Sequence, residues 1–432
     1  MEKKINFELS DDVKIVDLAL KLSEYDDKEI EEFCSSLEDK ELARILEESE
    51  EKIQKKIIGF ISNERAISVF EFMSKDDIVD ILGSINTGRR KQLVNVMKEG
   101  DKKVIRKLLG YKDDTAGGIM TTEYISLYKR LTVKEAIIKI KEITPETEYI
   151  ETIYVMEDNK KIIGTVELRD ILITDENVTL EKITNENFIY VEPETDQEQV
   201  ALTVSKYDLN AIPVLNKRKM MLGIITIDDI VDVIVEEQTE DVLKMGGVAK
   251  EETLDSTLLE SVKLRLPWLF VNLITAFLAA LTVKAFESTI AKVVALSAIM
   301  SIVTGMGGNA GTQTVSIIIR NIAMGKVEFK DTWRLVVKEF FLGIIDGALI
   351  GLATGIIVSF IYGNIYLGLI IFLAMVGNLI VSGVFGIVIP IVLEKMKIDP
   401  ALSSSIFLTT ATDVLGFFIF LSLASVFLPK LL

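Results

Sequence analysis

The hydrophobic positions of this 432-residue chain follow three different spacings in succession. Up to about residue 115 they recur at helical intervals, as in Ile30, Phe33 and Leu37, with Lys and Glu on the opposite face. From about residue 120 apolar strands alternate with helical segments, and from about residue 267 the apolar stretches are long enough to cross a bilayer. The pattern therefore predicts a helical region, an α/β region and a membrane region, in that order.

The first region predicts short helices stacked as helical hairpins. Polar runs separate its apolar segments, and Ser74-Lys75-Asp76-Asp77 has the composition of a helix N-terminus. Taken alone, this architecture indicates a packing or docking module and no chemistry.

An internal repeat with a constant offset of 59 residues organises the α/β region. The strand at 153–155 and the segment from Gly164 to Asp170 recur as the strand at 212–214 and the segment from Gly223 to Asp229. Each copy predicts two apolar strands and a helix that opens at the Asp, where the helix dipole and capping favour a carboxylate. A purely structural role in shaping the turn between strand and helix remains the alternative for these residues.

After the repeat, acidic residues cluster on one predicted helix. They are Asp228, Asp229, Asp232, Glu236, Glu237, Glu240 and Asp241. Most fall three or four residues apart, so their carboxylates repel one another unless a cation lies among them. The pattern indicates either a cation site or a solvated charged face. Gly246-Gly247 ends this helix, and a second, amphipathic helix leads through Arg265 into the membrane.

Apolar stretches predict five membrane spans. They lie at 267–286, 291–319, 339–361, 365–393 and 402–428. The loop between the second and third spans holds the densest basic cluster of this half, and the positive-inside rule places it in the cytoplasm. We therefore expect a multi-pass protein of the cell membrane with a cytoplasmic N-terminus and an outer C-terminus. The polar sequence after Met1, without a signal-peptide core, agrees with this orientation.

Polar residues inside the predicted spans mark candidate chemistry. Asp413 lies near the middle of the last span, which contains no basic residue, and an acid at that depth costs about 3 kcal/mol. It indicates an aqueous path for a cation, with a protonated Asp at a helix contact as the alternative. The second span contains Asn309 within the glycine-rich segment 305–313. A helix break there would free carbonyl oxygens as ligands, whereas close helix packing is the other use of glycines.

Composition narrows the possible partners. The chain has 48 basic and 65 acidic residues; residues 263–432 hold 12 and 8 of these, so residues 1–262 carry a net charge of −21. Such an acidic region argues against nucleic acid as a partner. Histidine is absent and Cys34 is the single cysteine, so any metal would take oxygen ligands, as Mg²⁺ and Ca²⁺ do. An enzyme is not expected, because the sequence has no nucleophile–base pair and no P-loop.

Several motifs together carry a resemblance over essentially the full length. They are Asp114-Thr-Ala-Gly117-Gly-Ile-Met120, Arg265-Leu-Pro-Trp268, Gly307-Gly308-Asn309, Asp399-Pro400-Ala401 and Thr412-Asp413. The chain resembles the MgtE family of magnesium channels and transporters, and its repeat resembles a tandem pair of CBS (cystathionine-β-synthase-like) modules. The resemblance implies a multidomain fold with five parts. These are an all-α superhelical N-domain (1–119), an α/β CBS pair (120–180 and 181–240), a linking plug helix (241–265) and an α-helical transmembrane pore domain of five spans (266–432).

The resemblance also implies partners and site residues. It implies a homodimer with one Mg²⁺ pore lined by the second and fifth spans, in which Asp413 is the pore acid, helped by Asn309 and Thr412. Regulatory Mg²⁺ ions would bind between the cytoplasmic domains and the plug. By position their carboxylates are Glu198, Asp208, Asp229, Asp232, Glu237, Glu240, Asp241 and Asp399. ATP is implied as a modulator through Thr226 and Asp229, whereas Glu167 replaces the hydroxyl residue in the first copy.

These expectations combine into a gate controlled by charge. At low internal Mg²⁺ the acidic faces repel and the plug helices leave the pore; at high Mg²⁺ bridging ions favour the closed assembly. Two other hypotheses stay open. One is an exchanger that couples the divalent ion to Na⁺ or H⁺, with Asp346 of the third span as its coupling acid. The other is a nucleotide-sensing membrane receptor that moves no ion.

Overall fold

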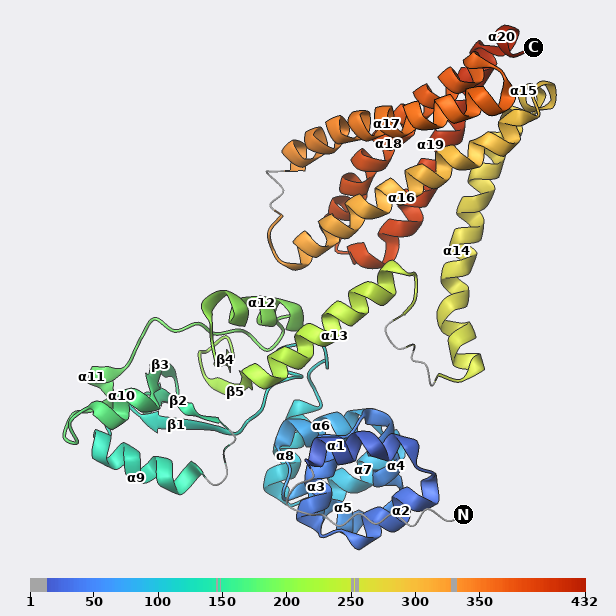
Figure 1. Cartoon of the computed structure of the whole chain (residues 1–432). Coiled ribbons are helices and arrows are strands. Elements are labelled where there is room, and N and C mark those ends of the chain that lie inside the picture. Colours follow the sequence, from blue (N-terminus) through green and yellow to red (C-terminus); the bar gives the residue numbers. More distant parts are fainter. Residues whose placement is uncertain (1–13, 145–146, 148, 250–251, 253–255, 328–331) are drawn as a thin grey trace. The chain divides into compact units, whose positions relative to one another are not determined.

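A computed structural model describes residues 14–144, 147, 149–249, 252, 256–327 and 332–432 (Figure 1). The chain forms two compact units, Met1–Val233 and Ile234–Leu432. Helix α13 (Ile227–Met245) begins in the first unit and ends in the second.

Short helices build the N-terminal part of the first unit. They are α1 (Ile15–Lys21), the 3-10 turn η1 (Leu22–Glu24), α2 (Asp27–Ser36), α3 (Asp39–Glu47), α4 (Glu51–Phe60), α5 (Asn63–Phe70), α6 (Lys75–Ser84), α7 (Thr87–Val96) and α8 (Glu99–Leu108). Helices of this length are unstable alone and depend on packing. Each helix from α1 to α6 packs on the helix two places along, as α2 does on α4, α4 on α6 and α6 on α8. The predicted short helices are confirmed, and their periodic apolar residues, such as Ile30 and Phe33, are buried.

The remainder of the first unit is the predicted α/β pair. Its elements are β1 (Tyr124–Tyr128), α9 (Val133–Ile143), β2 (Tyr149–Met156), β3 (Ile162–Glu167), α10 (Leu168–Ile173), α11 (Leu180–Ile183), α12 (Gln197–Tyr207), β4 (Ala211–Leu215) and β5 (Met221–Thr226). One sheet has the order β1-β2-β3, and β4 pairs with β5 in the other. The repeat is visible in the register, because Val155 pairs with Gly164 and Val214 pairs with Gly223.

The two copies of the repeat exchange their leading segments. Thr121 precedes the first copy but forms two backbone hydrogen bonds with β5 of the second, at 2.8 and 2.9 Å. Asn185 precedes the second copy and bonds in the same way to β3 of the first, at 2.9 and 3.1 Å. A Cβ at Gly164 would lie 2.3 Å from the Asn185 carbonyl oxygen, and one at Gly223 would lie 2.4 Å from that of Thr121. The repeated glycines therefore permit the backbone approach that joins the copies.

Beyond α13 the second unit is helical. Its helices are α14 (Leu258–Ala285), α15 (Glu287–Lys292), α16 (Ala295–Ala323), α17 (Thr332–Tyr362), α18 (Ile365–Lys395), α19 (Pro400–Val426) and α20 (Leu428–Leu431). A capping box between Thr257 and Glu260 opens α14, which continues through Pro267 without a break. The predicted amphipathic helix and the first predicted span thus share one helix.

Four helices of the described chain are long and apolar enough to cross a membrane. They are Leu258–Ala285, Thr332–Tyr362, Ile365–Lys395 and Ser404–Val426. The second predicted span corresponds to α16, whose 29 residues are enough to cross but which is not among these four. Its middle is rich in glycine, amide and hydroxyl groups, which lowers its hydropathy. Four of the five predicted spans thus correspond to long apolar helices, whereas the span predicted at 291–319, which corresponds to α16, stays a prediction.

Small residues join α17 to α18. Gly343, Gly347, Gly351 and Gly355 recur every four residues along α17 and are buried. A Cβ at Gly347 would lie 2.6 Å from the Cα of Val376 in α18. This spacing lets two helix backbones approach closely where lipid offers no hydrophobic driving force between helices.

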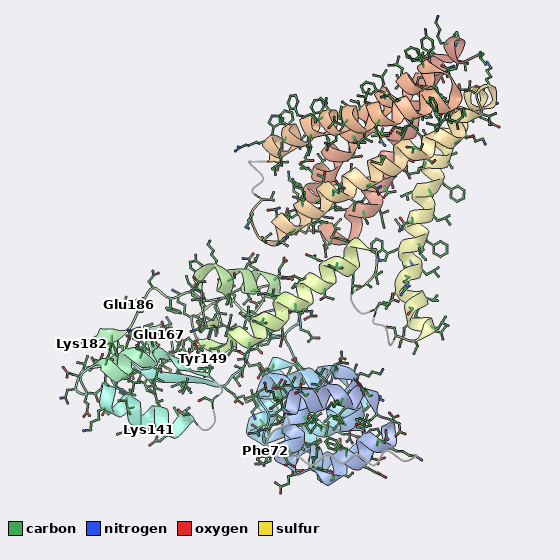
Figure 2. The ribbon with its side chains drawn as sticks, viewed as in Figure 1. Phe72, Lys141, Tyr149, Glu167, Lys182 and Glu186 are labelled. Atoms are coloured by element: carbon green, nitrogen blue, oxygen red, sulfur yellow. The ribbon has the colours of Figure 1, made fainter. Side chains whose placement is uncertain are left out.

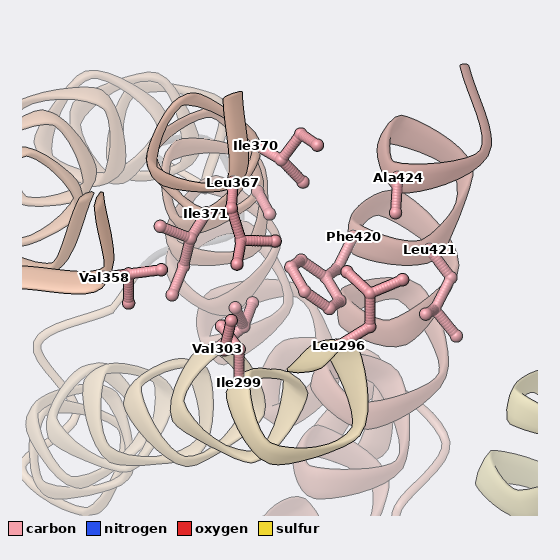
Figure 3. Packing of buried hydrophobic residues seen from close by; sticks show 11 residues of the cluster. Leu296, Ile299, Val303, Val358, Leu367, Ile370, Ile371, Phe420, Leu421 and Ala424 are labelled. Atoms are coloured by element: carbon pink, nitrogen blue, oxygen red, sulfur yellow. The ribbon is translucent and has the colours of Figure 1, made fainter. Parts of the chain in front are cut away.

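A compact apolar cluster joins α16, α18 and α19. Phe420 of α19 is fully buried and lies among Leu296 and Ile299 of α16 and Ile370 of α18 (Figure 3). The cluster fixes α16 against α19, the two helices that carry Asn309 and Asp413.

Candidate ion path and acidic clusters

The polar segment of α16 divides between two faces. Gly307 and Gly311 are buried, whereas Asn309, Thr312 and Gln313 are exposed in the single chain. Exposed amide and hydroxyl groups at membrane depth cost free energy unless they meet water or another protein surface. This face of α16 is therefore suited to line an aqueous path.

The expected break of α16 within 305–313 is wrong, because the helix is continuous through its glycines. The carbonyl oxygens of Val303 and Gly307 accept hydrogen bonds from Asn378 Nδ2 (2.8 Å) and Ser382 Oγ (2.7 Å) of α18. A Cβ at Gly307 would lie 2.1 Å from Asn378 Nδ2. Gly307 and Gly311 thus serve close helix packing, and the helix keeps its own backbone hydrogen bonds.

Two contacts fix the register of α16 against α19. Gly311 approaches Leu408, and Asn378 approaches both Gly307 and Gly416. The numbering falls along α16 as it rises along α19, so the two helices are antiparallel. Asp413 therefore lies at the depth of Asn309. Its neighbour Thr412 is fully buried and donates its hydroxyl hydrogen to the Thr409 carbonyl at 3.1 Å.

At the start of α19, Asp399 meets the last turns of α13. One Asp399 oxygen accepts from the Ala401 amide at 2.8 Å and caps the helix, and the other pairs with Lys244. Lys244 also pairs with Glu240. Burial and the Asp399 charge raise the pKa of Asp241. Three of the predicted ion-binding carboxylates therefore gather here, around a lysine that the prediction did not include.

A second acidic cluster surrounds Asp229 in the first unit. It consists of Asp76, Asp77 and Asp80 of α6 with Asp228 and Asp229 of α13. The Thr226 hydroxyl donates to Asp229 Oδ2 at 2.7 Å. Asp76 Oδ1 is buried and has no hydrogen-bond partner among the described residues.

Burial, reinforced by repulsion from neighbouring carboxylates, raises the pKa of Asp76, Asp77, Asp80 and Asp229. The pKa of Asp77 rises to about 6, that of Asp80 to about 7 and that of Asp229 to about 6. Hydrogen bonds from Ser74 to Asp77 and from Thr226 to Asp229 act in the opposite direction. The Asp80 side chain is exposed, so solvent screening reduces its contribution. The cluster thus favours binding of protons or of cations with oxygen ligands.

The other predicted ion-binding residues lie apart from these clusters. Glu198 is in the first turn of α12 and Asp208 is its C-cap with φ +51°, so the helix separates them by about 15 Å. Asp232 and Glu237 lie along α13. Within the described ranges no group of three or more Asp, Glu or Cys side chains is close enough to hold a metal ion. The assignment of these carboxylates to ions stays a prediction.

The nucleotide motif differs between the two copies of the repeat. Thr226 and Asp229 of the second copy are present and hydrogen-bonded to each other. In the first copy Glu167, labelled in Figure 2, ends β3 and accepts from the Thr152 hydroxyl at 3.2 and 3.3 Å. A carboxylate at that position would repel phosphate, so the second copy is the better nucleotide candidate.

Sequence reasoning missed Asp76, Asp77 and Lys244. The run at 74–77 predicts a helix start, and Ser74 does cap α6, but this pattern gives no sign that α6 faces Asp229. The signal for Lys244 was its position four residues after Glu240, which is the spacing of a helical ion pair.

Three family models match the chain. The MgtE intracellular N domain matches residues 13–114, and the CBS domain matches 116–175 and 180–236. The MgtE model, described as a divalent cation transporter, matches 300–423. The matches follow the order of the helical N-terminal part, the repeat and the membrane helices.

Relatives match over most of the length. The chain is 30% identical to the magnesium transporter MgtE of Bacillus subtilis (strain 168), over 98% of this chain and 93% of the relative. It is 36% identical to the magnesium transporter MgtE of Enterococcus faecalis, over 75% and 71% of the two chains. A crystal structure of the cytosolic domain of the Mg²⁺ channel MgtE in complex with ATP matches 52% of this chain and 91% of its own, with a TM-score of 0.50 and 26% identity. These relatives are named as magnesium transporters, which is not an enzymatic function. This chain belongs to the MgtE family of magnesium transporters.

Proposed function

We propose that this protein conducts Mg²⁺ across the cell membrane through a pore completed by two copies of the chain. The observation that carries the proposal is the common depth of Asp413 and Asn309 on two packed helices. The exposed polar face of α16 supports it, because such a face at membrane depth needs water or a second copy against it. In this arrangement α16 is the second of five membrane spans, the N-terminus is cytoplasmic and the C-terminus is outside.

The side chains at this depth suit an ion that prefers oxygen ligands and keeps most of its hydration water. Mg²⁺ loses its hydration shell reluctantly and is bound through few carboxylates. Asp413 would supply the charge, and the Asn309 amide would hydrogen-bond to the ion's water. Thr412 is fully buried beside Asp413 and donates its hydroxyl hydrogen to the Thr409 carbonyl, so it would hold this part of α19 in place and would not contact the ion's water.

Cytoplasmic Mg²⁺ would close this pore by neutralising the two acidic clusters. The raised pKa values around Asp229 support this role, because they arise in part from carboxylates that repel one another. The other cluster includes Asp399, the N-cap of the helix that carries Asp413, beside Glu240 and Asp241 of α13. An ion bound better in the closed than in the open state shifts the population toward closure.

ATP would act as a modulator through the second copy of the repeat. The intact pair of Thr226 and Asp229 supports this, as does the ATP complex of the related cytosolic domain. Binding should be lost in Thr226→Val, whereas Thr152→Val in the first copy should leave it unchanged; isothermal titration with ATP measures both.

Flux into liposomes tests the transport proposal. Protein reconstituted with an inward Mg²⁺ gradient, and with no Na⁺ or proton gradient, should take up Mg²⁺, reported by an entrapped dye. Absence of uptake under these conditions would contradict a passive pore.

An ion-coupled exchanger is the second candidate. Its supporting observation is Asp346, an acid exposed in the middle of α17 in the single chain. In an exchanger Asp346→Asn should abolish Mg²⁺ movement, and an imposed Na⁺ or proton gradient should drive it. A pore keeps its flux in this variant and needs no second gradient.

A further inference from the structure

The last turn of α13 is docked on the membrane helices of the second unit. Met245 packs against an apolar cluster formed by Val315 and Ile319 of α16 with Ala401 and Leu408 of α19. This contact places the end of the acidic helix beside the start of α19. An interaction that holds this contact would therefore act directly on α19, the helix that carries Asp413.

Lys244 lies next to Met245 and supplies such an interaction. Its ammonium group pairs with Glu240 one turn earlier and with Asp399, the N-cap of α19. The Lys244 and Glu240 side chains are only 19% and 12% exposed, and that of Asp399 is 35% exposed. Ion pairs shielded to this degree are screened less by salt than surface pairs.

The charge of Lys244 compensates only part of the negative charge around it. Its ammonium group lies between the carboxylates of Glu240 and Asp399, and Asp241 follows Glu240 on α13. One ammonium among Glu240, Asp241 and Asp399 leaves a formal charge of −2. The same carboxylates that hold the lysine are therefore those that a divalent cation would seek.

We propose that Lys244 is a built-in counter-ion that holds the end of α13 on the pore helices when no divalent cation is bound, and that Mg²⁺ must displace it to bridge Glu240 and Asp399. The second half of this proposal rests on the proposed function, and the first half does not. The tether limits how far the end of α13 moves when Mg²⁺ leaves. Without the lysine, only the apolar contact of Met245 and any bound Mg²⁺ would hold the end of α13.

Labelling of a single cysteine at the docked turn tests the tether. The native Cys34 is buried and burial raises its pKa to about 11, so its thiol reacts slowly with maleimide. Full-length protein carrying Met245→Cys is labelled in detergent, in EDTA and in saturating Mg²⁺. Val242→Cys, at a side chain that is 70% exposed, gives the rate for an open position on the same helix. Lys244→Met removes the charge and keeps the length of the side chain, whereas Lys244→Arg keeps the charge.

The proposal makes a distinct prediction for each variant. With Lys244 or Arg present, labelling at 245 should be slow in both solutions. In Lys244→Met it should become at least about fivefold faster in EDTA and return to the slow rate in Mg²⁺. Lys244→Met protein that elutes as a folded species yet stays slow in EDTA would overturn the tether.

The two halves of the proposal fail separately. A Lys244→Met variant that is fast in EDTA and equally fast in saturating Mg²⁺ would overturn displacement by the ion and leave the tether supported. Liposome uptake of Mg²⁺ by the unsubstituted protein reports the proposed function independently. Its absence would overturn transport without changing what labelling in EDTA says about Lys244.

Discussion

Asp229 gives the sharpest test of the acidic cluster in the first unit. Burial, with the charges of Asp76 and Asp228, raises the pKa of Asp229 from 3.8 to about 6, although the Thr226 hydrogen bond opposes the rise. Its ionised form is therefore less stable in the folded protein than in the unfolded chain. Asp229→Asn removes the charge and keeps an oxygen that accepts the Thr226 hydroxyl.

The stabilisation expected in Asp229→Asn can be worked out from the pKa of Asp229. One pKa unit corresponds to about 1.4 kcal/mol, so ionised Asp229 costs the folded state at most about 3 kcal/mol at neutral pH. The carboxyl group is partly exposed, and solvent screening reduces this to about 1.5 kcal/mol. Local opening should therefore be roughly tenfold rarer in Asp229→Asn.

Hydrogen exchange of the full-length protein measures this opening. At pH 7.5 in EDTA, amides of α6 and of the first turn of α13 should exchange about tenfold more slowly in Asp229→Asn. Mg²⁺ should slow the same amides in the unsubstituted protein and have a smaller effect in the variant. Glu186→Gln changes an exposed acid of the same unit, labelled in Figure 2, and should leave exchange unaltered. Faster exchange in Asp229→Asn without Mg²⁺ would refute the repulsion.

Three other perturbations test the remaining parts of the account. The folded-state pKa values of Asp77, Asp80 and Asp229 are raised to about 6 or 7, so the stability that these groups contribute should be complete below about pH 4 and be lost as the pH rises through 6 to 7. Exchange in α6 in EDTA, corrected for intrinsic rates, checks this, and stability that increases with pH would contradict it. Gly347→Leu should destabilise the protein by about 3 kcal/mol and lower its melting temperature, because the new side chain meets the backbone of α18. Gly305→Ala, with open space around its Cβ, should leave the melting temperature unchanged, and equal melting temperatures in the two variants would refute the packing. Asn378→Ala should lower the free energy of unfolding by about 2 kcal/mol, because it loses the hydrogen bond to the Val303 carbonyl and leaves a cavity. The same melting scan measures this, and an unchanged melting temperature would show that this buried amide adds no stability.

Local patterns predicted most of the fold. Helical spacing of apolar residues gives the short helices, since packing of one face is what stabilises them. The 59-residue repeat predicts two copies with matching strands, and in the structure the pairing of Val155 with Gly164 recurs as that of Val214 with Gly223. The exchange of leading segments between copies has no local signature, because it joins segments that are far apart in the sequence, as Thr121 and Ile224 are.

Contacts between distant segments explain what the sequence did not reveal. Asp76 and Asp229 belong to separate helices, and only the packing of the first unit brings their charges together. Lys244 and Asp399 are 155 residues apart, so the helical spacing reveals the pair with Glu240 but not its second partner. The glycines of α16 fit both a break and close packing in the sequence, and only the position of Asn378 decides for packing.

Ion current tests the central claim most directly. Purified protein and its Asp413→Ala variant would be recorded in planar bilayers while Mg²⁺ is raised stepwise on the cytoplasmic side. The account predicts Mg²⁺ currents that fall as cytoplasmic Mg²⁺ rises and that are absent in Asp413→Ala. Currents of equal size in the variant would contradict the assignment of the ion path to Asp413, and currents indifferent to cytoplasmic Mg²⁺ would contradict the gate.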